Sequence, residues 1–415
     1  MMEHPTMPPK PASLNRRNFL KTSIGGSAIL AASSNLATDV RAAAQKPAVS
    51  TLPLPTRKLG RTGARVSMIN LGTGWAPDPR MLEIAWQNGV RYFDTADCYA
   101  NGKAEANIRR WLEAHPERRK DLFLVTKDHP KQPKDLLEQV DRRLETLGTD
   151  YIDLFFIHWI QEKTYGPQCF DWPRSDEMKR VAEKLKATGK IKLFGFSCHS
   201  SRRPRFMTAA AEGGFMDALM VSYSPFPEPE GEMDRALDAC AEAGVGIIAM
   251  KTMRGAVATI PRRIPEFDKL GLTAHQGVLQ AVWSDERIAS ICSAMDTVEK
   301  IEENTAAARQ YDGPLKTADR RALREAVLTA GLNYCPDCAD RVAEAAGKPE
   351  LALGDIARFV NYYEVDGTLE ARDWYRALPT TARDATGADL SAATGLCGCG
   401  VDYASVLNKA RRYFA

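Results

Sequence analysis

Several features that would point to particular functions are missing from this 415-residue chain. No apolar run reaches the ~18 residues that a membrane-spanning helix needs, so the sequence predicts no membrane span. The formal net charge is only +3 and no basic stripe with interleaved aromatics is present, which argues against nucleic-acid binding. No G-x-G-x-x-G follows the first predicted strand, which weakens a doubly wound dinucleotide-binding fold. The composition is that of an ordinary globular protein, with 44% hydrophobic and 26% charged residues.

The nine cysteines do not follow the pattern of a disulfide framework. Lone buried cysteines usually behave as small hydrophobic residues, and five lie singly in segments typical of a core: Cys98, Cys169, Cys198, Cys240 and Cys292. The other four form two close pairs near the C-terminus, Cys335 with Cys338 and Cys397 with Cys399. Four thiolates are the minimum for one [4Fe–4S] cluster or one zinc ion. A cluster, a zinc ion, or free or disulfide-paired cysteines all stay open.

The first 44 residues have the character of a targeting segment. Arg16 and Arg17 precede a weakly apolar stretch of small residues, and Ala42-Ala43-Ala44 gives an A-x-A-like cleavage site. The two arginines followed by Asn-Phe-Leu-Lys resemble a twin-arginine export signal, the alternative being a disordered basic tail. We therefore expect a signal peptide over 1–44, a linker over 45–56, and a protein that the twin-arginine machinery exports, for example to the periplasm.

From Arg57 onward, short apolar runs alternate with helical patterns eight times. The runs cover residues 66–72, 90–96, 121–127, 151–159, 191–197, 218–224, 245–251 and 288–295. Segments 133–148 and 175–190 have apolar spacings near 3.6, and Gly148 and Gly189 stand where helices stop. Short apolar strands between helices indicate a parallel sheet covered by helices. Eight such units in roughly 250 residues favour an α/β fold, a (β/α)8 TIM barrel over 57–310, with a helical domain over 311–415.

Polar side chains stand at the ends of the second, third and fourth predicted strands. Asp94 and Tyr99 follow the second strand, Lys127 ends the third and His158 ends the fourth. In a barrel the chemistry lies at the carboxyl ends of the strands, so these four side chains are expected to meet there. A tyrosine has a pKa of about 10, which a neighbouring ammonium lowers, and a carboxylate can hold that ammonium in place. Such a site can protonate a developing alkoxide while hydride arrives at carbon, with the histidine bonding the carbonyl oxygen.

Each of these residues taken alone has an ordinary structural explanation. Asp94 could cap a strand end, Lys127 could extend its ammonium group into solvent, and His158 could be a core histidine whose hydrogen bonds are all made. Their order, and their common position at strand ends, make the catalytic interpretation the stronger one. Asp97 and Cys98 have no such support and are interpreted as turn residues.

The sequence resembles the aldo-keto reductases over about residues 57–310. The resembling stretches are LGRTGARVSMINLGTG, GVRYFDTADCYANGKAEANI, FLVTK, YIDLFFIHW, ATGKIKLFGFSCHS and IAMKTMRG, in the family's order. The resemblance implies a (β/α)8 barrel that uses NADP or NAD. It also implies that Tyr99 donates the proton, that Lys127 and Asp94 adjust the pKa of Tyr99, and that His158 orients the carbonyl.

The cofactor residues that the resemblance implies are only partly kept. The family commonly holds the nicotinamide with Ser-Asn after the fifth strand and a glutamine on the sixth. Here Ser197 is present, but Cys198 and Met220 stand at the other two positions. Glu303 and Asn304 match the family's adenine contacts.

The cationic pair that would bind a 2′-phosphate is missing from segment 291–304. Asp296 lies in that segment, and its charge would repel a phosphate. Lys251 and Arg254, after the seventh strand, could recover part of the positive charge. The resemblance therefore leaves the choice between NADP and NAD open.

The last hundred residues resemble a branch of the family that ends in a ferredoxin-like domain. In that branch, Cys-x-x-Cys-x-x-Cys repeats bind two iron–sulfur clusters. This chain has four of the eight cysteines that two clusters need. We therefore interpret residues 311–415 as a degenerate ferredoxin-like domain, with Cys335, Cys338, Cys397 and Cys399 as candidate metal ligands.

These observations predict an exported oxidoreductase whose substrate is a small aldehyde, ketone or alcohol. The alternative is a non-catalytic barrel, a binding or redox-partner protein that has lost nicotinamide binding. Cys198, Met220 and the missing cationic pair around Ala294 support that alternative. The expected export supports it too, because soluble NADPH is not expected outside the cytoplasm.

Overall fold

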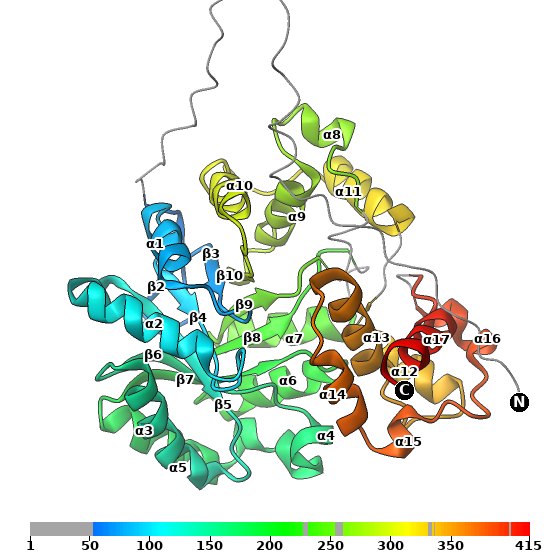
Figure 1. Ribbon diagram of the computed structural model, residues 1–415, viewed down its shortest axis with the longest axis horizontal. Coiled ribbons are helices and arrows are strands. Elements are labelled where there is room, and N and C mark those ends of the chain that lie inside the picture. The colour runs from blue at the N-terminus through cyan, green and yellow to red at the C-terminus, as the bar shows by residue number, and fades with distance from the viewer. Residues whose placement is uncertain (1–52, 227–230, 254–259, 331–333, 336, 398–399) are drawn as a thin grey trace, which may run out of the picture. The chain divides into compact units, whose positions relative to one another are not determined.

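Eight parallel strands close into a barrel in the computed structural model, which describes residues 53–226, 231–253, 260–330, 334–335, 337–397 and 400–415 (Figure 1). The strands are hydrogen-bonded in the order β10-β3-β4-β5-β6-β7-β8-β9. Their bounds are β3 Ile69–Gly72, β4 Tyr92–Asp94, β5 Phe123–Asp128, β6 Ile152–Ile157, β7 Ile191–Cys198, β8 Ala218–Ser222, β9 Gly246–Met250 and β10 Ile288–Ser293. The predicted (β/α)8 barrel is confirmed. The expected signal peptide, most of the expected linker, Arg254 and Cys399 lie outside the described residues.

The first predicted strand is divided into two parts. Residues 65–67 form β2 (Arg65–Ser67), which pairs antiparallel with β1 (Thr56–Lys58), and the barrel strand β3 begins only at Ile69. Leu59 and Val66 belong to the same buried cluster as side chains inside the barrel. The β1–β2 hairpin therefore packs its apolar side chains against the barrel interior, which explains why the apolar run begins before the barrel strand does.

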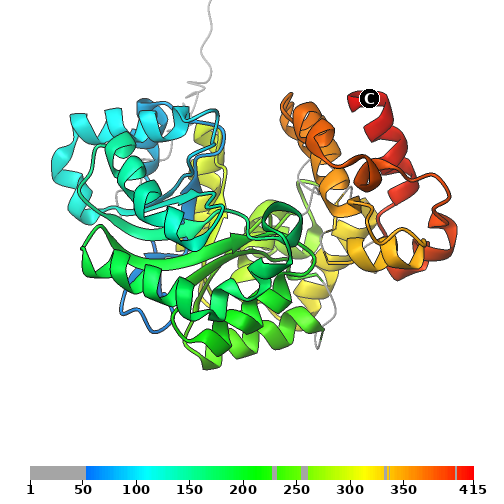
Figure 2. The same cartoon turned by 90° about the horizontal axis from the view of Figure 1, so that it is seen from below.

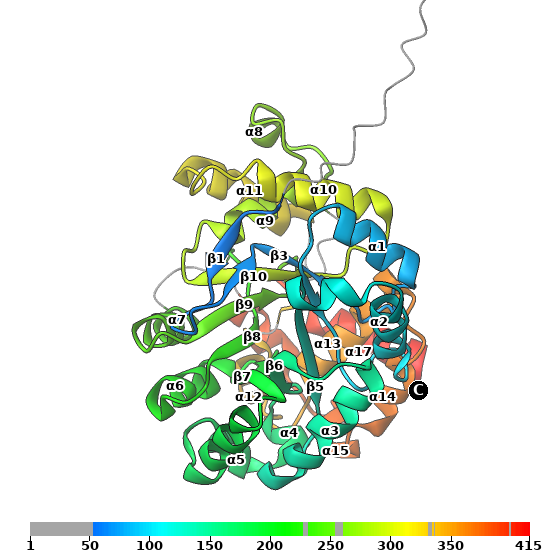
Figure 3. The same cartoon turned by 90° about the vertical axis from the view of Figure 1, so that its left-hand side faces the viewer.

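Helices follow each barrel strand and cover the outside of the sheet (Figures 1 and 3). They are α1 Pro79–Gln87, α2 Lys103–Ala114, α3 Leu136–Leu147, α4 Glu162–Tyr165, α5 Asp176–Ala187, α6 Arg203–Gly213, α7 Glu232–Glu242, α8 Pro265–Asp268, α9 Ala274–Trp283 and α10 Val298–Arg309. Strand β6, IDLFFI, is buried at every position because both faces of a parallel sheet are covered. Gly148 and Gly189 have φ of 64° and 75°, the left-handed conformation that ends a helix without strain.

The region after the barrel is helical, as the sequence predicted (yellow through orange to red in Figure 2). Its helices are α11 Thr317–Ala330, α12 Ala339–Ala345, α13 Leu353–Asn361, α14 Ala371–Ala377, α15 Thr380–Arg383, α16 Leu390–Ala393 and α17 Tyr403–Phe414. Helices α13 and α17 pack together, and Phe359 of α13 contacts Trp374 of α14 at a ring distance of 5.8 Å. None of the described helices is long and apolar enough to cross a membrane.

Candidate active site

A tight turn after β4 brings Tyr99 back over the end of its own strand. Asp94 is the last residue of β4, and α2 begins at Lys103. Between them Ala100, Asn101 and Gly102 have φ of 47°, 55° and 82°. Left-handed backbone is uncommon for alanine, and three such residues in succession reverse the chain within a few positions. Asn101 and Gly102 therefore form part of the turn that the sequence suggested.

Asp94, Tyr99 and Lys127 are in contact at the carboxyl ends of β4 and β5. Lys127 Nζ lies 2.6 Å from Asp94 Oδ2 and 2.8 Å from the Thr95 carbonyl oxygen, and it donates to the Tyr99 hydroxyl at 3.5 Å. The side chains of Asp94 and Lys127 are each 1% exposed. His158, directly after β6, faces the Tyr99 ring edge-on with centroids 5.6 Å apart. The structure thus brings together the four residues that the sequence singled out.

The electrostatics of this cluster differ from the expectation in one respect. We expected the Lys127 ammonium to lower the pKa of Tyr99. Instead burial raises the pKa of Tyr99 well above its usual value, and the Asp94 carboxylate adds to the increase. Burial also raises the pKa of Asp94, although Lys127 acts in the opposite direction. A phenol with a raised pKa stays protonated at neutral pH, which is the state that a proton donor needs.

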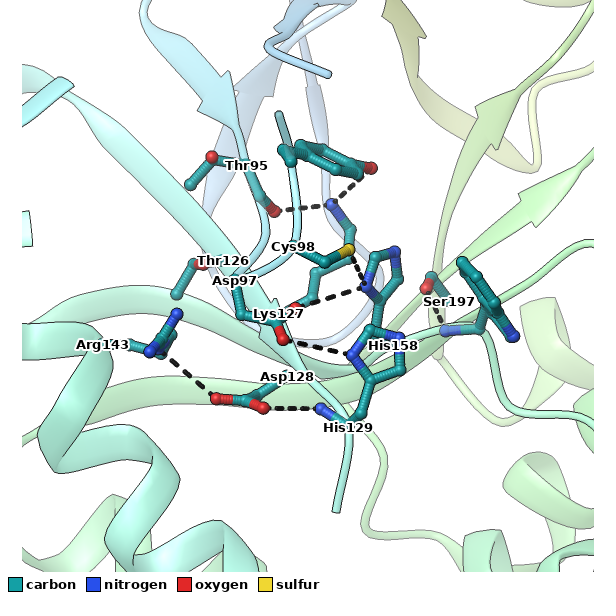
Figure 4. A network of polar contacts seen from close by, with 12 residues as sticks. Thr95, Asp97, Cys98, Thr126, Lys127, Asp128, His129, Arg143, His158 and Ser197 are labelled. Carbon is teal, nitrogen blue, oxygen red and sulfur yellow. Dashed lines mark hydrogen bonds and ion pairs between the residues drawn. The ribbon is translucent and has the colours of Figure 1, made fainter. Parts of the chain in front are cut away.

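The imidazoles of His129 and His158 converge on the carboxylate of Asp97 (Figure 4). Asp97 Oδ2 lies 3.2 Å from His129 Nδ1, and Asp97 Oδ1 lies 3.6 Å from His158 Nδ1. Cys98 Sγ lies 3.6 Å from the same His158 nitrogen. Burial lowers the pKa of His158 to about 3, so its imidazole is uncharged at neutral pH. Asp97 and Cys98 do lie in a turn, as interpreted, but their side chains point into the site.

His129 was missed by the sequence analysis. It is the first residue after β5, two positions beyond Lys127, and its backbone N–H donates to Asp128 Oδ1 at 2.7 Å. Arg143 of α3 in turn lies 3.3 Å from Asp128 Oδ2 (Figure 4). The signal was present in the sequence as a second histidine at the end of a strand, but its partner Asp97 comes from a different loop.

Glu105, a buried acid on α2, contacts strand β5. Glu105 is fully buried, accepts from Thr126 Oγ1 at 2.7 Å and pairs with Arg143 at 2.9 Å. Burial raises the pKa of the Glu105 carboxyl to about 7, although Thr126 and Arg143 act in the opposite direction. Folding therefore favours the protonated form of Glu105. This contribution to the free energy of unfolding is fully present below the pKa of Glu105 in the unfolded chain, and it is lost as the pH rises through 7.

Replacing this acid should change how the stability of the protein depends on pH. We expect the free energy of unfolding of wild type, relative to Glu105→Gln, to fall by roughly 2–3 kcal/mol between pH 5 and pH 8. Urea denaturation at the two pH values measures this difference. Glu113→Gln is the control, because Glu113 lies on the same helix with 57% of its side chain exposed. Parallel pH dependence for wild type and Glu105→Gln would contradict the assignment.

The residues expected at the cofactor site lie near the end of β7, directly after β9 and in the middle of α10. Ser197, near the end of β7, is buried, and its Oγ accepts from the Trp159 backbone N–H at 2.9 Å. Asn304 of α10 donates to Ser293 Oγ at 3.1 Å, and Glu303 Oε1 accepts from Thr273 Oγ1 at 2.6 Å. The described residues thus provide partners for three of the four expected cofactor residues within the barrel.

Two positions depart from a simple nucleotide site. Met220, opposite Ser197 in the β7–β8 register, is buried with the barrel interior and offers no hydrogen bond. Lys251, the fourth expected residue, follows β9 in a left-handed conformation with φ of 55°, and its Nζ donates to the Tyr362 hydroxyl. The tail thus supplies one partner for this lysine.

A small cleft beside Glu303 carries two arginines that the sequence analysis did not single out. The cleft is about 320 Å³ and is lined by Arg262, Arg263, Asp268, Gly271, Leu272 and Thr273. Arg262 is mostly exposed and lies 3.8 Å from Glu303, and Arg263 pairs with Asp268 at 2.9 Å. Adjacent arginines after the seventh strand were the available signal. Their closeness to α10 depends on the loop's path and could not be read from the sequence.

Three tail cysteines converge in the buried core of the helical region. Cys335, Cys338 and Cys397 are each no more than 6% exposed, and their sulfur atoms all lie within 4.8 Å of one another. None of these three is in a disulfide. The Tyr403 hydroxyl donates to the Cys335 carbonyl at 3.0 Å and ties this segment to α17. The two predicted pairs therefore do approach each other, at least through these three thiols.

Comparison with known proteins identifies the family. The model of the aldo/keto reductase family matches residues 78–306, more than half of the chain. The chain belongs to the aldo/keto reductase family. It is 30% identical over 224 residues to the uncharacterized oxidoreductase YrpG of Bacillus subtilis. The match covers 48% of this chain and 66% of the relative. The chain is 27% identical over 331 residues to a D-threo-aldose 1-dehydrogenase of Pseudomonas sp, covering 70% of this chain and 92% of that one.

The chain matches about two thirds or less of the length of the first four curated relatives. Among solved structures, the aldo-keto reductase AKR11C1 from Bacillus halodurans superposes with a TM-score of 0.53 at 20% identity, covering 68% of this chain and 99% of that one. An aldo-keto reductase from Klebsiella pneumoniae in complex with NADPH gives a TM-score of 0.53 at 22% identity, covering 66% and 95%. At this identity the two structures show the shared barrel alone.

Proposed function

We propose that this aldo/keto reductase reduces an aldehyde or ketone, or oxidises the corresponding alcohol, with Tyr99 as the proton donor. The observation that carries the proposal is the contact of the buried Lys127 with both Asp94 and the Tyr99 hydroxyl at the carboxyl end of the barrel. Oxidoreductases among the similar proteins support the reaction class. The alternative is a binding or redox-partner barrel that has lost nicotinamide binding, which the departure at Met220 favours.

Each residue of the cluster has a distinct task in the proposed reaction. The protonated Tyr99 hydroxyl gives its proton to the carbonyl oxygen as that oxygen gains negative charge. The Lys127 ammonium, fixed by Asp94 and the Thr95 carbonyl, stabilises the phenolate that is left behind. The uncharged His158 hydrogen-bonds the carbonyl oxygen and sets its direction. A bound nicotinamide nucleotide would supply or accept the hydride.

The described residues fit a nicotinamide nucleotide at most of the expected positions. The Ser197 hydroxyl accepts from Trp159, which leaves its own proton free to donate to a carboxamide. Asn304 and Glu303 would hold the adenosine end on α10. Arg262 and Arg263 add two guanidinium groups beside Glu303, a type of group that suits phosphate. Met220 is the exception, because a thioether cannot replace an amide.

Nucleotide titration of the full chain separates the enzyme from the non-catalytic alternative. We expect saturable quenching of tryptophan fluorescence by NADPH, by NADH or by both, together with turnover of at least one aldehyde from a panel. Arg262→Ala should weaken the binding of NADPH more than the binding of NADH if the arginine cleft binds a 2′-phosphate. If neither nucleotide binds, the reductase proposal is wrong and the binding-protein alternative stands.

We also propose that the tail thiols hold one metal ion. In a tetrahedral site with metal–sulfur bonds of about 2.3 Å, the sulfur atoms lie about 3.8 Å apart. In a [4Fe–4S] cluster each cysteine binds a different iron, so its sulfurs are spread more widely. Mutual separations within 4.8 Å among Cys335, Cys338 and Cys397 therefore favour a single ion, zinc by preference, over a cluster.

Metal analysis after anaerobic purification tests the tail proposal. We expect zinc without acid-labile sulfide, and one zinc fewer per chain in Cys338→Ser than in wild type. Cys240→Ser is the matched control, because Cys240 is an equally buried cysteine outside the group. About four irons with sulfide would indicate a cluster, and metal-free protein would indicate a tail that has lost the site.

Export through the twin-arginine pathway, for example to the periplasm, remains part of the proposal. Its support is the pair Arg16 and Arg17 followed by Asn-Phe-Leu-Lys and a stretch of small residues. A ferredoxin-like ancestry of the tail is likewise proposed, on the spacing of its cysteines.

A further inference from the structure

We propose that the loops after β4, β5 and β6 form a binding site for one divalent transition-metal ion, zinc by preference. Asp97, Cys98, His129 and His158 are the ligands. The inference goes beyond the proposed reductase activity, which requires no metal at these residues. It rests on the arrangement of the four side chains in Figure 4.

The four side chains lie close enough together to share one metal ion. One ligand atom from each residue lies within 4.8 Å of all the others. A tetrahedral zinc with bonds of 2.0–2.3 Å separates its ligand atoms by about 3.3–3.8 Å. Asp97 Oδ2 lies 3.2 Å from His129 Nδ1, and Asp97 Oδ1 lies 3.6 Å from His158 Nδ1. Cys98 Sγ lies 3.6 Å from the same His158 nitrogen. Little movement is therefore needed to place an ion between them.

Hydrogen bonding alone leaves part of this cluster unsatisfied. Asp97 Oδ1 is buried and has no hydrogen-bond partner among the described residues. Its distance of 3.6 Å from His158 Nδ1 exceeds the usual 2.7–3.2 Å of such a bond. The same nitrogen faces Cys98 Sγ, which is a weak partner. A cation between these atoms would satisfy the carboxylate oxygen, the imidazole lone pair and the sulfur together.

The donor set and its surroundings suit zinc rather than calcium or magnesium. Two imidazole nitrogens, one carboxylate and one thiol are the ligand types that zinc takes, whereas the hard cations prefer oxygen. Trp159 lies edge-on to both His129 and His158, at 5.3 and 5.2 Å, and limits how their rings can turn. Binding displaces the proton of the Cys98 thiol to solvent, so the thiol becomes a thiolate without any change of oxidation state.

Occupation of this site would place a divalent ion beside Tyr99, the proposed proton donor. His158 would bind the ion through Nδ1 and keep only Nε2 for the carbonyl oxygen, with its ring held by the metal. Zinc should therefore inhibit carbonyl reduction reversibly, and a chelator should restore it. This consequence depends on the proposed function, whereas the binding itself does not.

Zinc titration of chelator-treated full-length protein tests the site by two independent readouts. Isothermal titration calorimetry should show one zinc more per chain for wild type than for His129→Ala, or at least tenfold tighter binding at that site. His129 is partly exposed, so the His129→Ala variant should fold. His129 has no role in the proposed reaction. His115→Ala is the matched control, because His115 is similarly exposed and lies outside the cluster. The tail thiols contribute equally to all three proteins.

The inhibition assay then separates failure of this inference from failure of the reductase proposal. Zinc should inhibit wild type and His115→Ala at the concentration that calorimetry gives, and inhibit His129→Ala only at tenfold or higher concentration. Asp97→Asn, which keeps the size of the side chain, should weaken binding as His129→Ala does. Equal zinc binding by wild type and both cluster variants would overturn the site. Zinc binding without any reductase activity would leave the site in place and contradict the proposed function.

Discussion

Tyr99→Phe should lower kcat for carbonyl reduction by about 10²–10⁴-fold, the range that general acid catalysis contributes. The phenylalanine keeps the ring that packs edge-on against His158 and removes only the hydroxyl that Lys127 contacts. Because that hydroxyl acts on the carbonyl oxygen, nucleotide affinity should stay within about twofold of wild type. Steady-state kinetics and fluorescence titration measure the two quantities on the same preparation.

Tyr92→Phe provides a closely matched control for this experiment. Tyr92 lies on β4, two positions before Asp94, and is fully buried. Its hydroxyl has no hydrogen-bond partner among the described residues, so its removal should leave both folding and kcat almost unchanged. If Tyr99→Phe kept wild-type kcat, or if Tyr92→Phe lost as much activity, the proton-donor role of Tyr99 would be excluded.

The barrel and its rim could be predicted because both depend on local sequence. Strands such as β6 and β8 are buried on both faces, so they appear in the sequence as nearly continuous apolar runs. A polar residue that ends such a run, as Lys127 does, must emerge at the carboxyl edge of the sheet. The closed barrel then places Lys127 beside Asp94, because β4 and β5 are neighbours.

Features that depend on burial or on contact between loops could not be predicted in the same way. The direction of the Tyr99 pKa shift is set first by burial of the phenol, and the sequence shows only that a lysine comes later. Asp97 was interpreted as a turn residue because its partner His129 lies 32 positions away, in a loop without a pattern. The division of residues 66–72 between β2 and β3 likewise follows from the β1–β2 hairpin, whose Leu59 and Val66 pack with side chains of the barrel strands.

Lys127→Met should abolish most of the activity and also destabilise the protein, for two different reasons. The Lys127–Asp94 pair is 1% exposed on both sides, so removing the ammonium leaves a carboxylate buried without its counter-charge. Breaking a buried pair from one side typically costs about 3–5 kcal/mol of stability. Protonation of Asp94 relieves part of this cost, since burial already raises the pKa of its carboxyl. The loss of activity arises instead because the phenolate of Tyr99 no longer has a cation beside it.

The double variant Lys127→Met/Asp94→Asn separates these two causes. With both charges removed, no buried charge is left without a partner, so urea denaturation should show most of the lost free energy of unfolding restored. The kcat should stay at the level of Lys127→Met, because neither methionine nor asparagine can stabilise a phenolate as the ammonium does. A double variant that regained activity with its stability would mean that Lys127 acts only through folding. One that stayed as unstable as the single variant would mean that the buried Asp94 charge was not the source of the loss.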